Sequence, residues 1–99
     1  MLESFTIETF APLVGGVFVT HLDPATEVTL ELVDALSARA GHPPAEMRSP
    51  FSLVFRGPRE PVAVQRIYRL DHPTLGSFEL FLVPVGPDDR GMRYEAVFT

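Results

Sequence analysis

A two-residue alternation of apolar and polar side chains runs through most of the chain after residue 16, and it restricts the fold more than any other feature. Val28, Leu30 and Leu32, for example, alternate with polar neighbours. This period is that of a β-strand with one buried face. The sequence therefore predicts six strands, at residues 17–22, 27–36, 51–56, 66–71, 77–84 and 92–98.

The connections between these runs favour antiparallel pairing. Residues 23–26, 71–76 and 86–91 are rich in Asp, Pro and Gly, the residues of tight turns. None of them is long enough for the helical crossover that a parallel pair requires. Pro84 interrupts an apolar run, which indicates a sheet edge or a bulge there. Residues 39–50, with Gly41 and three prolines, are expected to form a long exposed loop.

One short helix is expected near the N-terminus. Ile7, Phe10, Ala11 and Val14 have the spacing of one helical stripe. Ser4 or Thr6 is suited to cap it and Gly15–Gly16 to end it, but Pro12 removes a backbone donor. A helix over residues 6–11 follows. The expected fold class is mainly β (β-rich α+β): one domain over residues 1–99, a six-stranded antiparallel roll or small barrel with a short N-terminal helix.

Several apolar residues fall on the face of the strands that should contact water. A solvated sheet face is normally polar. The alternation nevertheless places six apolar residues there: Val33, Val54, Ile67, Phe81, Val83 and Val97. The first explanation is that the helix covers this face with Ile7, Phe10 and Val14. The second is that a partner or a second copy of the chain covers what a two-turn helix does not reach.

Composition excludes several classes of function. The chain has no cysteine, so disulfides, thiol nucleophiles and thiolate zinc sites are absent. A net charge of −5 argues against nucleic-acid binding. The longest apolar stretch, residues 13–19, is shorter than the ~20 residues of a membrane-spanning helix. Glu3 stands where a secretion signal carries cations. We therefore expect no membrane insertion and a cytoplasmic protein, or one in an assembly built in the cytoplasm.

The sequence shows no set of catalytic or metal-binding residues. His21, His42 and His72 lack ligand spacing, so neither a metal nor another cofactor is predicted. Ser77 lies outside any nucleophile-elbow motif. The Asp71 carboxylate is expected to accept hydrogen bonds from the backbone of the following turn. The hypothesis that the chain is not an enzyme follows from the lack of a nucleophile–base or acid–base set.

Charge is unevenly distributed along the chain. Residues 1–38 hold six acidic residues and no arginine, whereas residues 39–70 hold six arginines and two acidic residues. One interpretation is internal pairing, with Arg66 or Arg69 opposite acids on neighbouring strands. The other is a basic patch and an acidic patch that guide head-to-tail association.

Five segments resemble a small bacterial domain family of unknown function. They are residues 10–15 (FAPLVG), 51–58 (FSLVFRGP), 68–76 (YRLDHPTLG), 80–86 (LFLVPVG) and 94–98 (YEAVF). Some members of this family are encoded beside phage-tail-collar-like proteins. The resemblance implies a small structural or accessory part of a tail-like or fibre assembly. It implies no catalytic residues.

The functional hypothesis is a non-enzymatic interaction or assembly module that binds a protein partner or itself. The predicted interface combines Phe81, Val83 and Val97 with the turn containing Arg56 and Arg59 and with the loop containing His42, Pro43 and Pro44. One alternative is a small-ligand-binding barrel or minor enzyme, lined by Tyr68 and Tyr94 and entered near His21 or His72. Another is an inhibitor or immunity-type protein that uses the acidic N-terminal third against a basic target.

Overall fold

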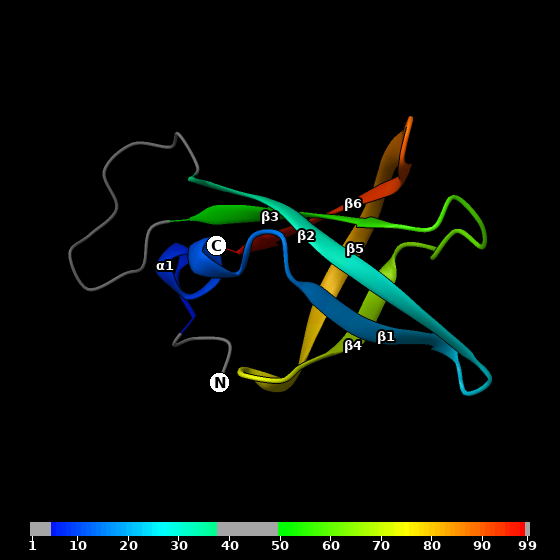
Figure 1. The fold of residues 1–99 in the computed structure, drawn as a ribbon, viewed down its shortest axis with the longest axis horizontal. Coiled ribbons are helices and arrows are strands. Elements are labelled where there is room, and N and C mark those ends of the chain that lie inside the picture. The colour runs from blue at the N-terminus through cyan, green and yellow to red at the C-terminus, as the bar shows by residue number, and fades with distance from the viewer. Residues whose placement is uncertain (1–4, 38–49, 99) are drawn as a thin grey trace.

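The computed structural model describes residues 5–37 and 50–98, which form a closed antiparallel barrel with a helical segment at one end (Figure 1). Around the barrel the strands follow the order β1-β2-β3-β6-β5-β4, in agreement with the expected fold class. The helical elements are α1 (Ile7–Phe10) and the 3-10 turn η2 (Ala11–Leu13). The strands are β1 (Val17–Asp23), β2 (Thr26–Ser37), β3 (Phe51–Gly57), β4 (Arg66–His72), β5 (Gly76–Asp88) and β6 (Gly91–Phe98).

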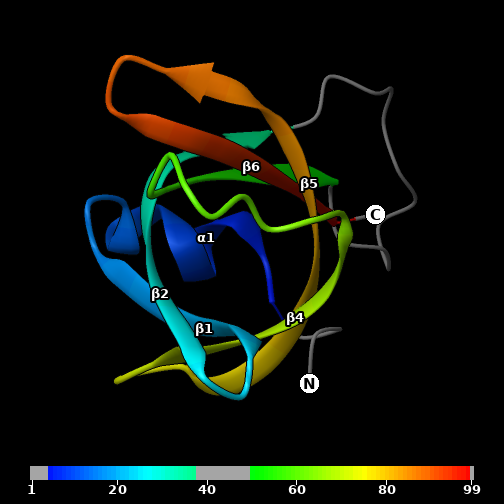
Figure 2. The ribbon, with the colours of Figure 1, turned by 90° about the vertical axis from the view of Figure 1, so that its right-hand side faces the viewer.

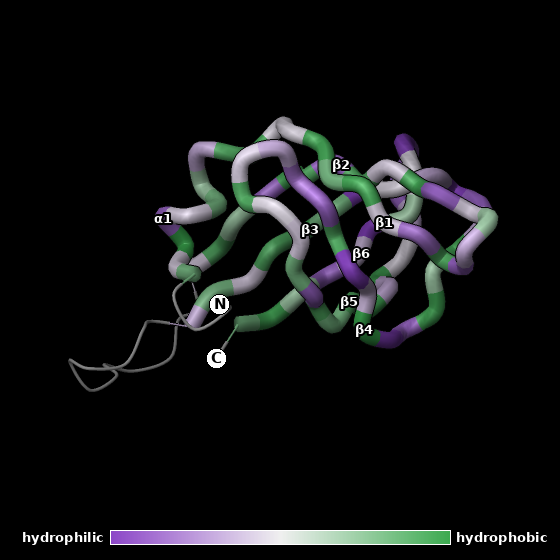
Figure 3. Tube along the Cα trace, turned by 90° about the horizontal axis from the view of Figure 1, so that it is seen from below, coloured by the Kyte–Doolittle hydropathy of each residue, from purple (hydrophilic) through white to green (hydrophobic). Residues whose placement is uncertain are grey.

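Apolar and polar residues alternate along the strands (Figure 3), and the buried side chains follow this alternation. In β3, for example, Phe51, Leu53 and Phe55 are buried while Ser52 and Val54 between them are partly exposed. Aromatic and aliphatic side chains fill the interior, which also holds the buried Thr20. The core therefore arises from a pattern that local sequence already contains.

The helical segment closes one end of the barrel. It does not cover the outer sheet face, although the first explanation from the sequence placed it there. Phe10 has no exposed surface, and its ring contacts Phe51, Phe78 and Phe98 on three different strands. Viewed down the barrel, α1 lies within the ring of strands (Figure 2). The prediction that α1 covers the outer face was wrong because the helix is too short and its aromatic side chain points inward.

Pro12 explains the length of the helix. The α-helix ends at Phe10, and the chain continues through the 3-10 turn in which Pro12 needs no backbone donor. Val14, the last residue of the expected helical stripe, lies beyond both and is 45% exposed. Gly15 N and Gly16 O then bond the carbonyl and the amide of Leu32, which attaches the segment to β2.

Strand β5 belongs to two ladders in succession. Its first half, from Gly76 to Leu82, pairs with β4, and its second half pairs with β6 from Val83 onward. The β5–β6 register shifts between Pro84 and Gly86, which agrees with one of the two features expected at Pro84, a bulge. Before Val83, the rings of Phe5 and Phe10 pack against Phe78 of β5, and Phe10 also contacts β6 through Phe98.

The contact between β1 and β4 closes the barrel and is the shortest ladder in it. Only two register pairs are formed, Val19 with Asp71 and Thr20 with Leu70. Side chains supplement them: Thr20 Oγ1 donates to the Arg69 carbonyl at 2.7 Å, and Arg66 donates to the Leu22 carbonyl. Closure thus depends on a buried threonine and an arginine as well as on backbone pairing.

We predict that Phe10→Ala lowers the free energy of unfolding by about 3–5 kcal/mol, because it removes a fully buried ring that joins three strands. Denaturant unfolding followed by circular dichroism measures the change. Val14→Ala is the matched control and is expected to change stability by less than about 0.5 kcal/mol. If the two substitutions lower the free energy of unfolding equally, the Phe10 ring does not hold the three strands together.

Candidate functional site

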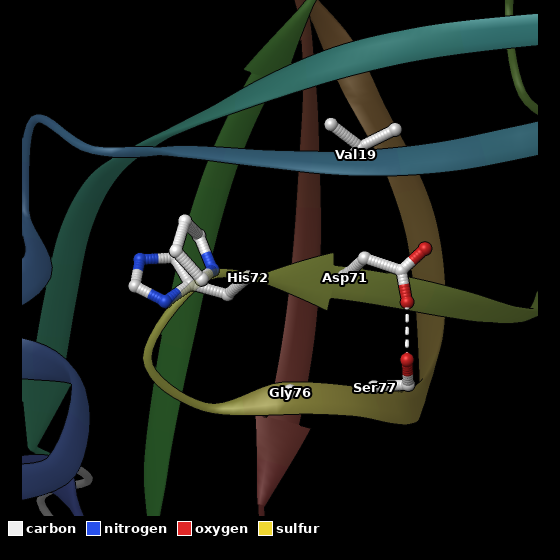
Figure 4. Close-up of a pocket in the computed structure, with 6 residues that line it drawn as sticks. Val19, Asp71, His72, Gly76 and Ser77 are labelled. Carbon is white, nitrogen blue, oxygen red and sulfur yellow. Dashed lines mark hydrogen bonds between the residues drawn. The ribbon is translucent and has the colours of Figure 1, made fainter.

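Two adjoining shallow pockets lie on the outer surface where β1 meets β4. The first, of about 290 Å³, is lined by His21, Arg69 and Asp71. The second, of about 450 Å³, is lined by residues of β1, β4 and the β4–β5 turn (Figure 4). Its lining residues are Val19, Asp71, His72, Pro73, Gly76 and Ser77. Asp71 contributes to both pockets and is therefore their central polar group.

Hydrogen bonds in these pockets join Asp71, Ser77 and Arg69. The Ser77 hydroxyl donates to the Asp71 carboxylate, and Arg69 donates to Ser77 Oγ at 3.1 Å and to Asp71 Oδ1 at 3.4 Å. The Ser77 hydrogen bond and the nearby Arg69 charge hold the pKa of Asp71 below its ordinary value. The serine hydroxyl is thus bound to a carboxylate and a guanidinium, which is not the serine–imidazole contact that activates a nucleophile.

The two histidines near the pockets have other contacts. The Nε2 atom of His21 lies 3.5 Å from a carboxylate oxygen of Glu27. His72 Nδ1 accepts the amides of Thr74 and Leu75 at 3.1 and 3.4 Å, and its ring packs on Phe18. The expectation that the Asp71 carboxylate holds the turn backbone was wrong. The imidazole takes that role, because the carboxylate is oriented toward Ser77 instead (Figure 4).

A second polar cluster surrounds Asp88 at the end of β5. Arg56 donates to its carboxylate from Nε at 3.0 Å and from the terminal nitrogen at 2.7 Å, and Glu31 lies 3.8 Å from the same guanidinium. Arg59 donates to the Asp88 carbonyl at 2.7 Å. The Arg56 hydrogen bonds and the amides of Arg90 and Gly91 lower the pKa of Asp88 to about 2. These two arginines of the predicted interface are therefore engaged within the chain.

The outer face of the β4–β5 hairpin carries exposed apolar side chains. We call the outward residues Ile67, Arg69, Asp71, Ser77, Glu79 and Phe81 the hairpin face. Ile67 and Phe81 are register partners on adjacent strands and are 61% and 48% exposed. Neither side chain contributes to the buried core.

The other residues of the predicted interface occupy different surroundings. Val97, on β6, is 61% exposed and pairs in register with Ser52 on β3. Val83 is only partly exposed, beside the start of the β5–β6 ladder. His42, Pro43 and Pro44 lie outside the described residues. Phe81 of the predicted set lies directly opposite another exposed apolar side chain, Ile67, which the predicted interface had left out.

The barrel interior is closed at the end opposite α1 by the segment between β3 and β4. Tyr94 Oη accepts the Ala63 amide at 2.8 Å, and Tyr68 Oη donates to the Val64 carbonyl at 2.6 Å. Both rings are almost completely buried. The two tyrosines expected to line a ligand cavity therefore anchor residues 63 and 64 over the core.

The described residues offer neither a cluster of metal ligands nor a helix that could cross a membrane. In residues 5–37 and 50–98, no group of three or more histidine or acidic side chains is arranged to hold a metal ion. Within the same residues, no helix has the length and apolar character needed to span a membrane.

The chain matches the family described as a domain of unknown function, DUF6916, over residues 5–98, and it belongs to that family. The resemblance to a family of unknown function is thereby confirmed. No curated protein and no solved structure matches the chain.

The Asp88 cluster predicts a dependence of stability on pH. Because the folded-state pKa of Asp88, about 2, lies below its ordinary value of 3.8, its contribution is complete above that ordinary value and is lost as the pH falls toward 2. We expect the free energy of unfolding to decline between about pH 5 and about pH 2. Asp88→Asn should reduce this decline, leaving the part due to Asp23 and Asp71, whose pKa values are also lowered. Urea unfolding at each pH measures the free energy of unfolding. If it declines equally with pH in the wild type and in Asp88→Asn, Asp88 is not the source of the dependence.

Proposed function

We propose that this domain is a non-enzymatic interaction or assembly module that binds a protein partner through the hairpin face. The observation that carries the proposal is the exposed pair of Ile67 and Phe81, directly opposite each other on two adjacent strands. Large aromatic side chains that lose their water on binding supply much of the energy of protein interfaces. A partner that covers this pair gains that energy without disturbing the core.

The polar residues beside the pair support recognition of a protein surface. Arg69 and Glu79 are the next outward register pair along the hairpin, and both are exposed. An apolar centre with charged residues at its margin is the usual composition of an interface between proteins that also exist separately. The hairpin face has both parts within one pair of strands.

The alternative functions have less support. A ligand in the barrel interior would have to displace the packed core and the Ala63 and Val64 contacts of Tyr94 and Tyr68. An inhibitor that uses the acidic N-terminal third would need free carboxylates. Glu31, however, lies beside Arg56, and the Asp23 carboxylate accepts the Ala25 amide in its own turn.

We further propose a structural or accessory role in a phage-tail-like or fibre assembly built in the cytoplasm. Its support is the sequence resemblance through the five segments named above. A module of this kind needs a stable fold and a surface that binds a partner. The barrel provides the fold, and the hairpin face provides the surface.

Phe81→Arg tests the proposal. A complex isolated with the tagged chain from its own cells should exceed the 11.0 kDa monomer mass by light scattering. The variant should elute as the monomer, because a charge replaces the larger side chain of the apolar pair. Its circular dichroism spectrum should remain that of the native protein.

Val64→Arg is the matched control, since Val64 is 63% exposed but lies on the segment between β3 and β4. It should retain the complex. If Phe81→Arg unfolds the chain, Phe81 belongs to the core and the proposal fails. The proposal also fails if both variants retain the complex.

A further inference from the structure

The three outward register pairs of the hairpin face each join complementary side chains. Ile67 lies opposite Phe81, Arg69 opposite Glu79, and Asp71 opposite Ser77. The pairs are thus apolar with apolar, cation with anion, and acceptor with donor. In every pair, the residue on β4 is the kind of group that the residue on β5 would bind.

We propose that the partner bound by the hairpin face is a second copy of this chain, related by a two-fold axis that runs parallel to β4 and β5. The axis passes in front of the hairpin face, over the midline between the two strands and halfway between the two copies. This inference rests on the proposed function and names its partner. Rotation about such an axis exchanges the positions of β4 and β5 and keeps the position along the strands. A two-fold interface uses the same surface on both copies, so that surface must complement itself.

The register pairs determine which residues meet. Ile67 of one copy faces Phe81 of the second copy, and Arg69 faces Glu79 of the second copy. Each contact is made twice, because the axis repeats it. Two sheets that pack face to face with nearly aligned strands are a common arrangement in antiparallel proteins. The hairpin face therefore forms two apolar contacts and two ion pairs with its own copy.

The contacts within one chain leave the Glu79 carboxylate for this role. Glu79 lies opposite Arg69 but has no ion pair within the described part of the chain, because Arg69 bonds Asp71 and Ser77. The Arg69 side chain is 69% exposed and accessible from outside. Opposite charges that face each other across an interface fix its register and disfavour other partners.

The size of the face indicates how tightly the copies bind. Seven residues per strand at ~3.4 Å, and two strands ~4.8 Å apart, give a face about 24 Å long and about 10 Å wide. This footprint is well below the ~800 Å² per partner of stable complexes. The dimer is therefore expected to be weak and to depend on protein concentration.

Charge exchange between Arg69 and Glu79 tests the inference. Arg69→Glu places two carboxylates opposite each other in the dimer, and Glu79→Arg places two guanidinium groups there. Sedimentation equilibrium from about 10 μM to about 1 mM measures association. Each single variant should remain monomeric where the wild type dimerises. An equimolar mixture of the two should dimerise, because each arginine then faces a glutamate on the other variant. The double variant carrying both changes should associate as the wild type does.

The controls carry the same charge changes elsewhere. The control variants are Arg90→Glu and Glu8→Arg. Arg90 lies in the β5–β6 turn, Glu8 lies on α1, and both residues are exposed. Both variants should dimerise as the wild type does, within about threefold in dissociation constant. Circular dichroism checks that every variant is folded.

Three outcomes would overturn the inference. A wild type that is monomeric at every concentration shows that the partner is not a second copy. The proposed function then still stands if Phe81→Arg releases a different protein from the complex made in cells. Single variants that associate as the wild type does, or a mixture that stays monomeric, show that copies do not meet through this pair.

Discussion

The packing of Phe10 against Phe51, Phe78 and Phe98 is the contact on which the barrel most depends. The helical segment places this ring between β5 and β6, in the part of β5 that precedes their shared ladder. Without it, the inner sides of β3, β5 and β6 would expose aromatic surface at that end. The short helix thus acts as part of the core and does not cover the outer surface of the sheet.

The charged residues of the barrel divide into those that hold the structure and those that remain accessible. Arg56, Glu31 and Asp88 form one partly buried cluster that fixes the β5–β6 hairpin against β3. Internal pairing, one of the two interpretations of the charge pattern, accounts for this cluster. Arg69 and Glu79 lie on the outer face beside Ile67 and Phe81, and this combination gives the hairpin face its character.

Much of this fold could be predicted from the sequence, because the alternation of Phe51, Leu53 and Phe55 encodes both the strand and its buried side. The position of α1 could not be predicted from the sequence. Periodicity shows which side of a helix is apolar, but it does not show what that side packs against. Of the candidate site, the outward position of Phe81 could be predicted from the alternation. The contact of Arg56 with Asp88 could not be predicted, because the two residues lie 32 positions apart in the sequence. The Ile67–Phe81 pairing follows only from the register across the β4–β5 turn.

The short β1–β4 ladder has a consequence for the order of folding. The β1–β2, β4–β5 and β5–β6 ladders join neighbouring strands through short turns, so their closure entropy is small. The contact of Thr20 with Arg69 joins residues 49 positions apart. Local hairpins are therefore expected to form first, and the short β1–β4 ladder is expected to close the barrel last. Until that step, the chain is an open sheet with two free edges, which makes the period before closure the one most exposed to pairing with another molecule.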